Sequence, residues 1–243
     1  MAHPLIAAGV FEHSGFRASP LAAASRLHHT VGAMLDITFG NEQTCGRALD
    51  GIRMIHKRVH GTLADPIGRF PAGTKYSAED PALVLWVHAT LVETMMITYE
   101  WMVAPLTADQ RDSYCAEAAW VPVALGARDA EIPRTWTSMR VYVDQMMNGD
   151  TLVVGPQAAE VGRALMWSSL GVMLPGSGWL NRLLTAALLP PRLRDGYGLK
   201  WTAGRERLAR RTAAIIRQLR YVTPDAVALW GSARHSQFPA RAA

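Results

Sequence analysis

Apolar residues recur at helical spacing along most of the chain, and strand-like alternation is scarce. The clearest example is the segment DPALVLWVHATLVETMMITYE, residues 80–100. Asp80 is an N-cap candidate, and Pro81 takes the first helical position, where its missing N–H costs nothing. The pattern therefore predicts a helix from residue 81 to about Met102, ended by Pro105.

The same spacing predicts further helices on both sides of this segment. A helix is expected over 42–61 with Gly61 as its C-cap, and another over 107–126, opened by a capping box of Thr107 and Gln110 and stopped at Gly126. Loops are expected over 61–80 and over LPPRLRDGYG. Further helices are expected over 135–149, 157–174, 178–189, 203–220 and 223–230. The fold class predicted is all-α, as a single domain over residues 1–243.

One histidine, His88, interrupts the apolar face of the 81–102 helix. The positions three, four and seven residues away on that face are all apolar, so His88 is expected to point inward. A buried imidazole needs hydrogen bonds or a metal for its nitrogens, because an unsatisfied one costs about 1–3 kcal/mol. Two interpretations stay open: His88 is a core histidine, or it is an axial ligand of a metal-containing cofactor that the chain itself does not supply. The neighbours are Val84, Leu85, Leu91, Val92 and Met95.

A second inward-facing histidine is expected on the 42–61 helix. His56 continues an apolar stripe through Ile52, and Arg53 lies at the edge of that stripe. Because an arginine keeps its charge, Arg53 needs a carboxylate or an anionic ligand. His60, four residues after His56, makes a zinc site with His88 conceivable, although the chain has no H-E-x-x-H motif.

Composition favours an apolar ligand more than a charged partner. Hydrophobic residues make up 49% of the chain and charged residues 19%, which leaves apolar surface to be covered. The net charge is +5, and its one dense basic patch, GRERLARRTAAIIRQLR, is typical of a solvated helix face. A nucleic-acid-binding protein is a remote alternative, since no reader helix or zinc spacing accompanies the patch.

The cysteine content and the lengths of the apolar stretches bear on how a cofactor is attached and on where the protein is located. With only Cys45 and Cys115, the sequence has no disulfide framework and no C-x-x-C-H motif, so any haem is expected to be non-covalent. The N-terminus lacks the charge and apolar pattern of a secretory signal. No uninterrupted apolar stretch reaches the ~18 residues of a membrane span. We therefore expect a cytoplasmic protein without a transmembrane segment.

The segments RMIHKRVHG and GTKYSAEDPALVLWVHATLVETMMITYEWMVAPLTADQRDSYCAE resemble the catalytic domain of the MpaB and rubber-oxygenase (latex-clearing protein) family. The resemblance also includes AHPLIAAGVFEHSGF, TFGNEQ and YGLKW; it covers roughly residues 2–202 and is strongest over 40–126. It implies a globin-like helical core that binds haem b non-covalently. Characterised members use dioxygen to cleave carbon–carbon double bonds in isoprenoid chains.

The resemblance also implies roles for particular residues. It makes His88 the proximal ligand of the haem iron and Arg53 a pocket arginine. His56 falls where rubber oxygenases have a distal lysine, so it either ligates the iron or contacts bound oxygen. Glu42 lies nearest to the family's catalytic glutamate, although a glutamate at a helix start also has a favourable dipole position.

Two functional hypotheses follow from these residues. The first is a haem-b-dependent oxygenase or oxidase that uses dioxygen on a small apolar, isoprenoid-like substrate, with Arg53, His56 and Glu42 as catalytic residues. The second is a non-catalytic haem-binding or lipid-binding helical protein, because the family's glutamate has no certain counterpart here.

Overall fold

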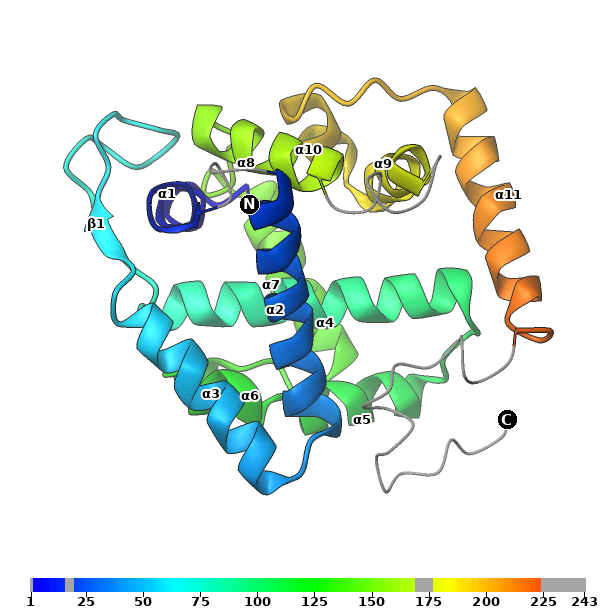
Figure 1. Cartoon of the computed structure of the whole chain (residues 1–243), viewed down its shortest axis with the longest axis horizontal. Helices are drawn as coiled ribbons and strands as arrows, with labels where there is room; N and C mark the ends of the chain where they lie inside the picture. The colour runs from blue at the N-terminus through cyan, green and yellow to red at the C-terminus, as the bar shows by residue number, and fades with distance from the viewer. Residues whose placement is uncertain (1, 16–19, 169–176, 224–243) are drawn as a thin grey trace.

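The computed structural model describes residues 2–15, 20–168 and 177–223, and helices dominate these ranges (Figure 1). This confirms the all-α prediction. The helices are α1 (Pro4–His13), α2 (Pro20–Phe39), α3 (Glu42–His56), α4 (Pro81–Met102), α5 (Ala108–Ala118), α6 (Trp120–Ala124), α7 (Trp136–Asn148), α8 (Pro156–Ser168), α9 (Ser177–Leu188), α10 (Pro191–Gly196) and α11 (Ala203–Leu219), and the two strands are β1 (His60–Thr62) and β2 (Lys75–Ser77).

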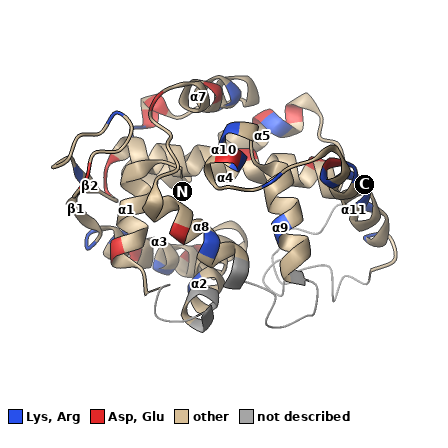
Figure 2. Cartoon of the chain, turned by 90° about the horizontal axis from the view of Figure 1, so that it is seen from above, with Lys and Arg blue, Asp and Glu red and all other residues tan. Residues whose placement is uncertain are grey.

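Helix α4 runs through the middle of the molecule, with α7 on one side of it and α2 on the other (Figures 1 and 2). Its buried face packs against α5, α6, α7, α9 and α11. Helix α2 instead packs against α3 and α8, and neither α2 nor α3 packs extensively against α4 in the described ranges. The main core therefore lies on one side of α4. Its fully or almost fully buried members include Trp86, Ala89, Val92, Met96, Cys115, Met139, Val143 and Leu152.

Several helix starts follow the predicted capping chemistry. The Asp80 side chain accepts a hydrogen bond from the Ala82 N–H at 2.8 Å, which caps α4 with Pro81 in its first turn. Thr107 and Gln110 form the reciprocal capping box that opens α5. These starts were predictable because each depends on side chains within three residues of the helix end.

The predicted 42–61 helix was wrong at its C-terminal end. Helix α3 stops at His56, and His60 to Thr62 pair with Lys75 to Ser77 as an antiparallel hairpin, in what was predicted to be helix and loop. Gly61 is therefore not a C-cap. A Cβ at Gly61 would lie 2.4 Å from the Tyr76 hydroxyl oxygen, so glycine allows the buried Tyr76 ring to pack on the strand.

Two other boundaries differ from the sequence prediction. The expected 107–126 helix is divided into α5 and α6, because Pro122 has no N–H to donate to the carbonyl of Ala118. Gly126 does end α6, with a φ of 103°. The expected loop over 189–198 contains the short helix α10, whose Pro191 occupies a position that tolerates proline.

The remaining expected helices correspond to α7, α8, α9 and α11 within the described ranges. The last residues of the predicted 157–174 helix and nearly all of the predicted 223–230 helix lie outside the described residues. Helices α1 and α2 carried no prediction.

By length and composition, α4 could cross a membrane, and it is the one such helix in the described part of the chain. Its most apolar window has a mean hydropathy of 1.4, and 44% of that window is buried within the protein. A core helix passes the same test, so the absence of a transmembrane segment stays a prediction.

His3, at the N-cap of α1, should make the protein less stable in mild acid. Its side chain is buried, and burial above all lowers the pKa of this imidazole from 6.5 to about 4. The unfolded chain therefore takes up a proton that the folded chain resists, so stability is lost as the pH falls from 6.5 towards 4. At pH 5 the loss from this residue should be roughly 2 kcal/mol. Urea unfolding of the wild type and of His3→Gln at pH 7 and pH 5 measures it, and an equal pH dependence in both proteins would contradict the assignment.

Candidate functional site

His88 lies on the central helix and is buried, with 8% of its surface exposed. Burial lowers the pKa of His88 to about 4, so the imidazole is neutral at physiological pH. Its Nε2 atom is buried and has no hydrogen-bond partner among the described residues. A neutral imidazole with an unused buried nitrogen has the chemistry of an axial iron ligand.

An exposed apolar stripe runs along α4 beside His88. It consists of Val87, Leu91, Met95 and Tyr99, spaced four residues apart, and we call it the α4 stripe. Val84, Leu85 and Val92 are buried, whereas Leu91 and Met95, which helical spacing put on the same face as His88, are 41% and 58% exposed. His88 therefore lies at the boundary between the core and an uncovered apolar surface.

Arg53 on α3 is exposed and already has partners. Its Nε and Nη2 atoms donate to the carbonyl oxygen of Ala124 at 3.0 Å and 2.7 Å, and Nη1 forms an ion pair with Asp50 at 2.8 Å. The carboxylate that the sequence required for this arginine is thus Asp50, one turn earlier on the same helix. The arginine joins the C-terminal half of α3 to the end of α6.

His56 is the last residue of α3 and is half-buried. Desolvation by burial lowers the pKa of its imidazole, and the nearby Glu79 carboxylate opposes this effect. His56 is therefore also a neutral imidazole at physiological pH, next to the start of α4.

Glu42 and His60 do not have the positions relative to His56 that the predicted roles require. Glu42 is the first residue of α3 and is exposed, about 21 Å along the helix axis from His56 at 1.5 Å per residue over 14 residues. His60 lies on β1, so the helical pairing of His56 and His60 that a zinc site needs does not form. Within the described residues no cluster of three or more histidine, cysteine or acidic side chains could hold a metal ion.

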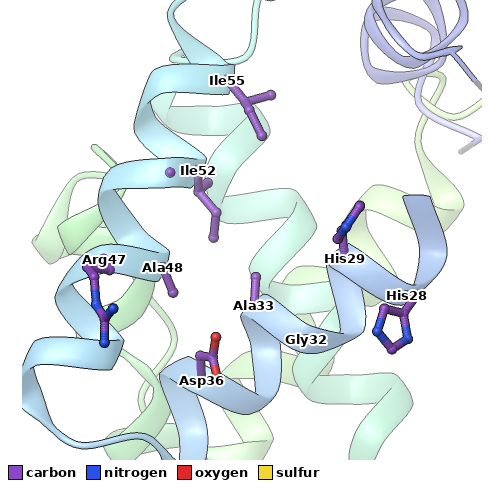
Figure 3. A pocket seen from close by; sticks show the side chains of 10 residues that line it. His28, His29, Gly32, Ala33, Asp36, Arg47, Ala48, Ile52 and Ile55 are labelled. Atoms are coloured by element: carbon purple, nitrogen blue, oxygen red, sulfur yellow. The ribbon is translucent and has the colours of Figure 1, made fainter. Parts of the chain in front are cut away.

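A cavity of about 330 Å³ lies between α2 and α3 (Figure 3). Ala33 points from α2 and Ile52 from α3 into the space between the helices (Figure 3). A Cβ at Gly51 would have no heavy atom within 4 Å, so this glycine borders open space. The cavity could not be predicted from the sequence, because half of its lining residues come from α2, which carried no prediction. The lining residues are His28, His29, Gly32, Ala33, Asp36, Arg47, Ala48, Gly51, Ile52 and Ile55.

The fold and the site together define a helical protein with a buried, unused imidazole beside an uncovered apolar surface. The chain belongs to the family described as "ER-bound oxygenase mpaB/B'/Rubber oxygenase, catalytic domain", whose model matches residues 1–218. This confirms the resemblance seen in the sequence. The protein is thus a member of an oxygenase catalytic-domain family.

The chain is similar to two uncharacterised mycobacterial proteins. One is from Mycobacterium bovis and the other from Mycobacterium tuberculosis; each is 24% identical over 183 residues, covering 73% of this chain and 68% of the relative. No solved structure matches the chain.

Proposed function

We propose that this protein is a haem-b-dependent oxygenase that uses dioxygen to oxidise a small apolar, isoprenoid-like substrate. The observation that carries the proposal is the buried Nε2 atom of His88, which lacks a hydrogen-bond partner in the described ranges. Leaving such a nitrogen unused costs about 1–3 kcal/mol, and a bond to iron removes that cost. Membership of an oxygenase family supports the proposed oxygenase activity.

The residues around His88 fit a haem. Its imidazole is neutral and therefore able to donate a lone pair. The α4 stripe beside it offers Val87, Leu91 and Met95 as apolar surface for a porphyrin face or for substrate. When bound, haem iron supplies the oxygen chemistry, and the protein supplies orientation and polarity.

His56 is the polar residue proposed to contact a ligand at the cofactor, and Arg53 is proposed to position it. Because the His56 imidazole is neutral, one ring nitrogen can donate a hydrogen bond to a polar ligand while the other accepts one. The role of Arg53 is indirect: it holds α3 against the Ala124 carbonyl group and so fixes the helix end that carries His56. A porphyrin or apolar substrate that covered the α4 stripe would displace water from it.

The test is haem reconstitution of the full chain. Protein expressed with haem supplementation should show a Soret band and about one haem b per chain in a pyridine haemochrome assay. It should also consume oxygen with an unsaturated isoprenoid. Absence of a Soret band after supplementation would overturn the proposal.

A non-catalytic haem carrier is a second candidate, favoured by the position of Glu42. With Glu42 at the far end of α3 from His56, none of the predicted catalytic residues supplies a carboxylate base beside the histidine. Stoichiometric haem without oxygen consumption on a panel of unsaturated apolar substrates would establish the carrier in place of the oxygenase.

Replacing His56 with alanine should keep the haem but change its spectrum. The residue is half-buried at a helix end, so alanine should cost little stability, and His88 would still hold the iron. We expect full haem content with a shifted Soret maximum or an altered rate of oxygen consumption. The matched control is His60→Ala on the adjacent exposed strand, which should match the wild type. If His56→Ala also matches the wild type in spectrum and rate, His56 has no role on the cofactor.

A further inference from the structure

Helix α11 has an apolar surface on the side that faces away from the protein. Ala209 and Ala213 are buried, and the helix packs against α4 and α9. On its other side, Leu208, Ile215 and Leu219, continued by Val222 after the helix end, are exposed. Leu208, Ile215 and Leu219 return to one side of α11, with Arg211 and Thr212 in the turn between the first two. Val222 follows in the turn after the helix, and we call these four apolar residues the α11 stripe.

The exposure of the α11 stripe is large for aliphatic side chains. Ile215 is 59% exposed and Leu219 is 52% exposed. The helix is fixed in this orientation, because the Arg217 guanidinium donates to the carbonyl oxygens of Glu100 and Trp101 at the end of α4. Figures 1 and 2 both place α11 at one edge of the molecule, where a flat surface can reach it.

Arginines flank the α11 stripe on both sides. Arg207 and Arg211 lie along one side of the stripe, and Arg205 lies along the other. Glu206, the acidic residue of α11, is engaged by Arg210 at 2.8 Å and by the Trp201 indole N–H at 3.0 Å. Within the described residues Arg207 and Arg211 form no ion pair.

We propose that the α11 stripe and its flanking arginines dock the protein on an anionic membrane surface. An amphipathic helix with an apolar line between rows of arginine binds in the plane of a lipid headgroup layer, where aliphatic side chains enter the apolar boundary and guanidinium groups contact phosphates. The proposal is independent of haem binding and concerns where the protein works.

The charge pattern favours a membrane over a second copy of the chain and over a nucleic acid as the partner of the α11 stripe. A second copy of α11 laid on the same stripe would bring arginine against arginine, because the single acidic residue of the helix is already engaged. A nucleic acid would use the arginines but would leave Leu208, Ile215 and Leu219 without a function. Only a surface that is anionic at its outer edge and apolar below uses both sets of side chains.

The test is sedimentation of the full chain with vesicles. We expect the protein to bind vesicles of equal parts phosphatidylglycerol and phosphatidylcholine, to bind pure phosphatidylcholine weakly, and to lose affinity as salt is raised. The double variant Arg207→Gln/Arg211→Gln should bind about 30-fold more weakly, from about fivefold for each arginine near the surface. Leu219→Asp should abolish binding.

The matched control is Val141→Asp on α7, where the exposed fraction is the same 52% as at Leu219. This variant carries the same added charge and should bind vesicles like the wild type. Three results would each overturn the proposal: no wild-type binding to anionic vesicles, equal loss in both aspartate variants, or a dimer in analytical ultracentrifugation that Leu219→Asp converts to a monomer. Retention on duplex DNA that Leu219→Asp leaves unchanged, without vesicle binding, would assign the arginines to nucleic acid instead.

Discussion

Replacing His88 with alanine should abolish haem binding while the helical fold is retained. The imidazole supplies the proposed iron ligand, whereas α4 is held by the buried side chains of Val84, Leu85 and Val92. After haem-supplemented expression, the pyridine haemochrome assay should find little haem in His88→Ala. Far-UV circular dichroism should match that of the wild type.

His3→Ala is the matched control for this variant. Like His88, His3 is buried, has a pKa lowered to about 4, and has a ring nitrogen without a described partner. Both substitutions remove a buried imidazole, so both should lower stability by a few kcal/mol at most. Only His88→Ala should lose haem. Full occupancy with an unchanged spectrum in His88→Ala would make His88 a core histidine.

A glutamate at Met95 should block haem binding without unfolding the protein. Met95 is 58% exposed, so in the absence of a ligand the new carboxylate stays hydrated and costs little stability. A porphyrin or apolar substrate lying on the α4 stripe would strip that water from the charge, which costs several kcal/mol. Haem affinity measured by absorbance titration should therefore fall at least about 100-fold, while the urea midpoint stays close to that of the wild type.

Val141→Glu provides the comparison, because this position is exposed to a similar degree and belongs to α7 instead of α4. It should bind haem like the wild type. Wild-type affinity in Met95→Glu would show that the ligand does not cover the α4 stripe, and would move the cofactor to another part of the protein.

The parts of the fold that depend on neighbouring residues were predictable from the sequence. The starts of α4 and α5 follow from Asp80 with Pro81 and from Thr107 with Gln110, whose interactions span two or three residues. The end of α3 was not predictable in this way. It depends on the Tyr76 ring packing against Gly61, a contact between two strands of a hairpin that local periodicity cannot reveal.

The same limit applies to the candidate site. Helical spacing correctly put His88 on an inward face, since its burial follows from Val84 and Val92 on either side. The spacing could not tell that Leu91 and Met95 stay uncovered, because a pattern gives the direction of a side chain and not what packs on it. The Asp50 partner of Arg53 lies three residues away, but its Ala124 partner is out of reach of local reasoning, since Ala124 lies 71 residues further along the chain.

The hairpin between α3 and α4 joins the end of one helix to the start of the next. His56 ends α3 four residues before β1 begins, and β2 ends three residues before the cap of α4. The hairpin from His60 to Ser77 therefore makes up most of the chain between the two helices. The register of His60 with Ser77 then fixes how far the two helix ends can separate, whatever the length of the chain beyond the strands. The segment between the strands also packs on the core, because Leu63 is buried beside Leu5 and Ala8 and Arg69 pairs with Asp150 at 3.4 Å, so a change in its length would disturb the packing of α1 as well as the hairpin.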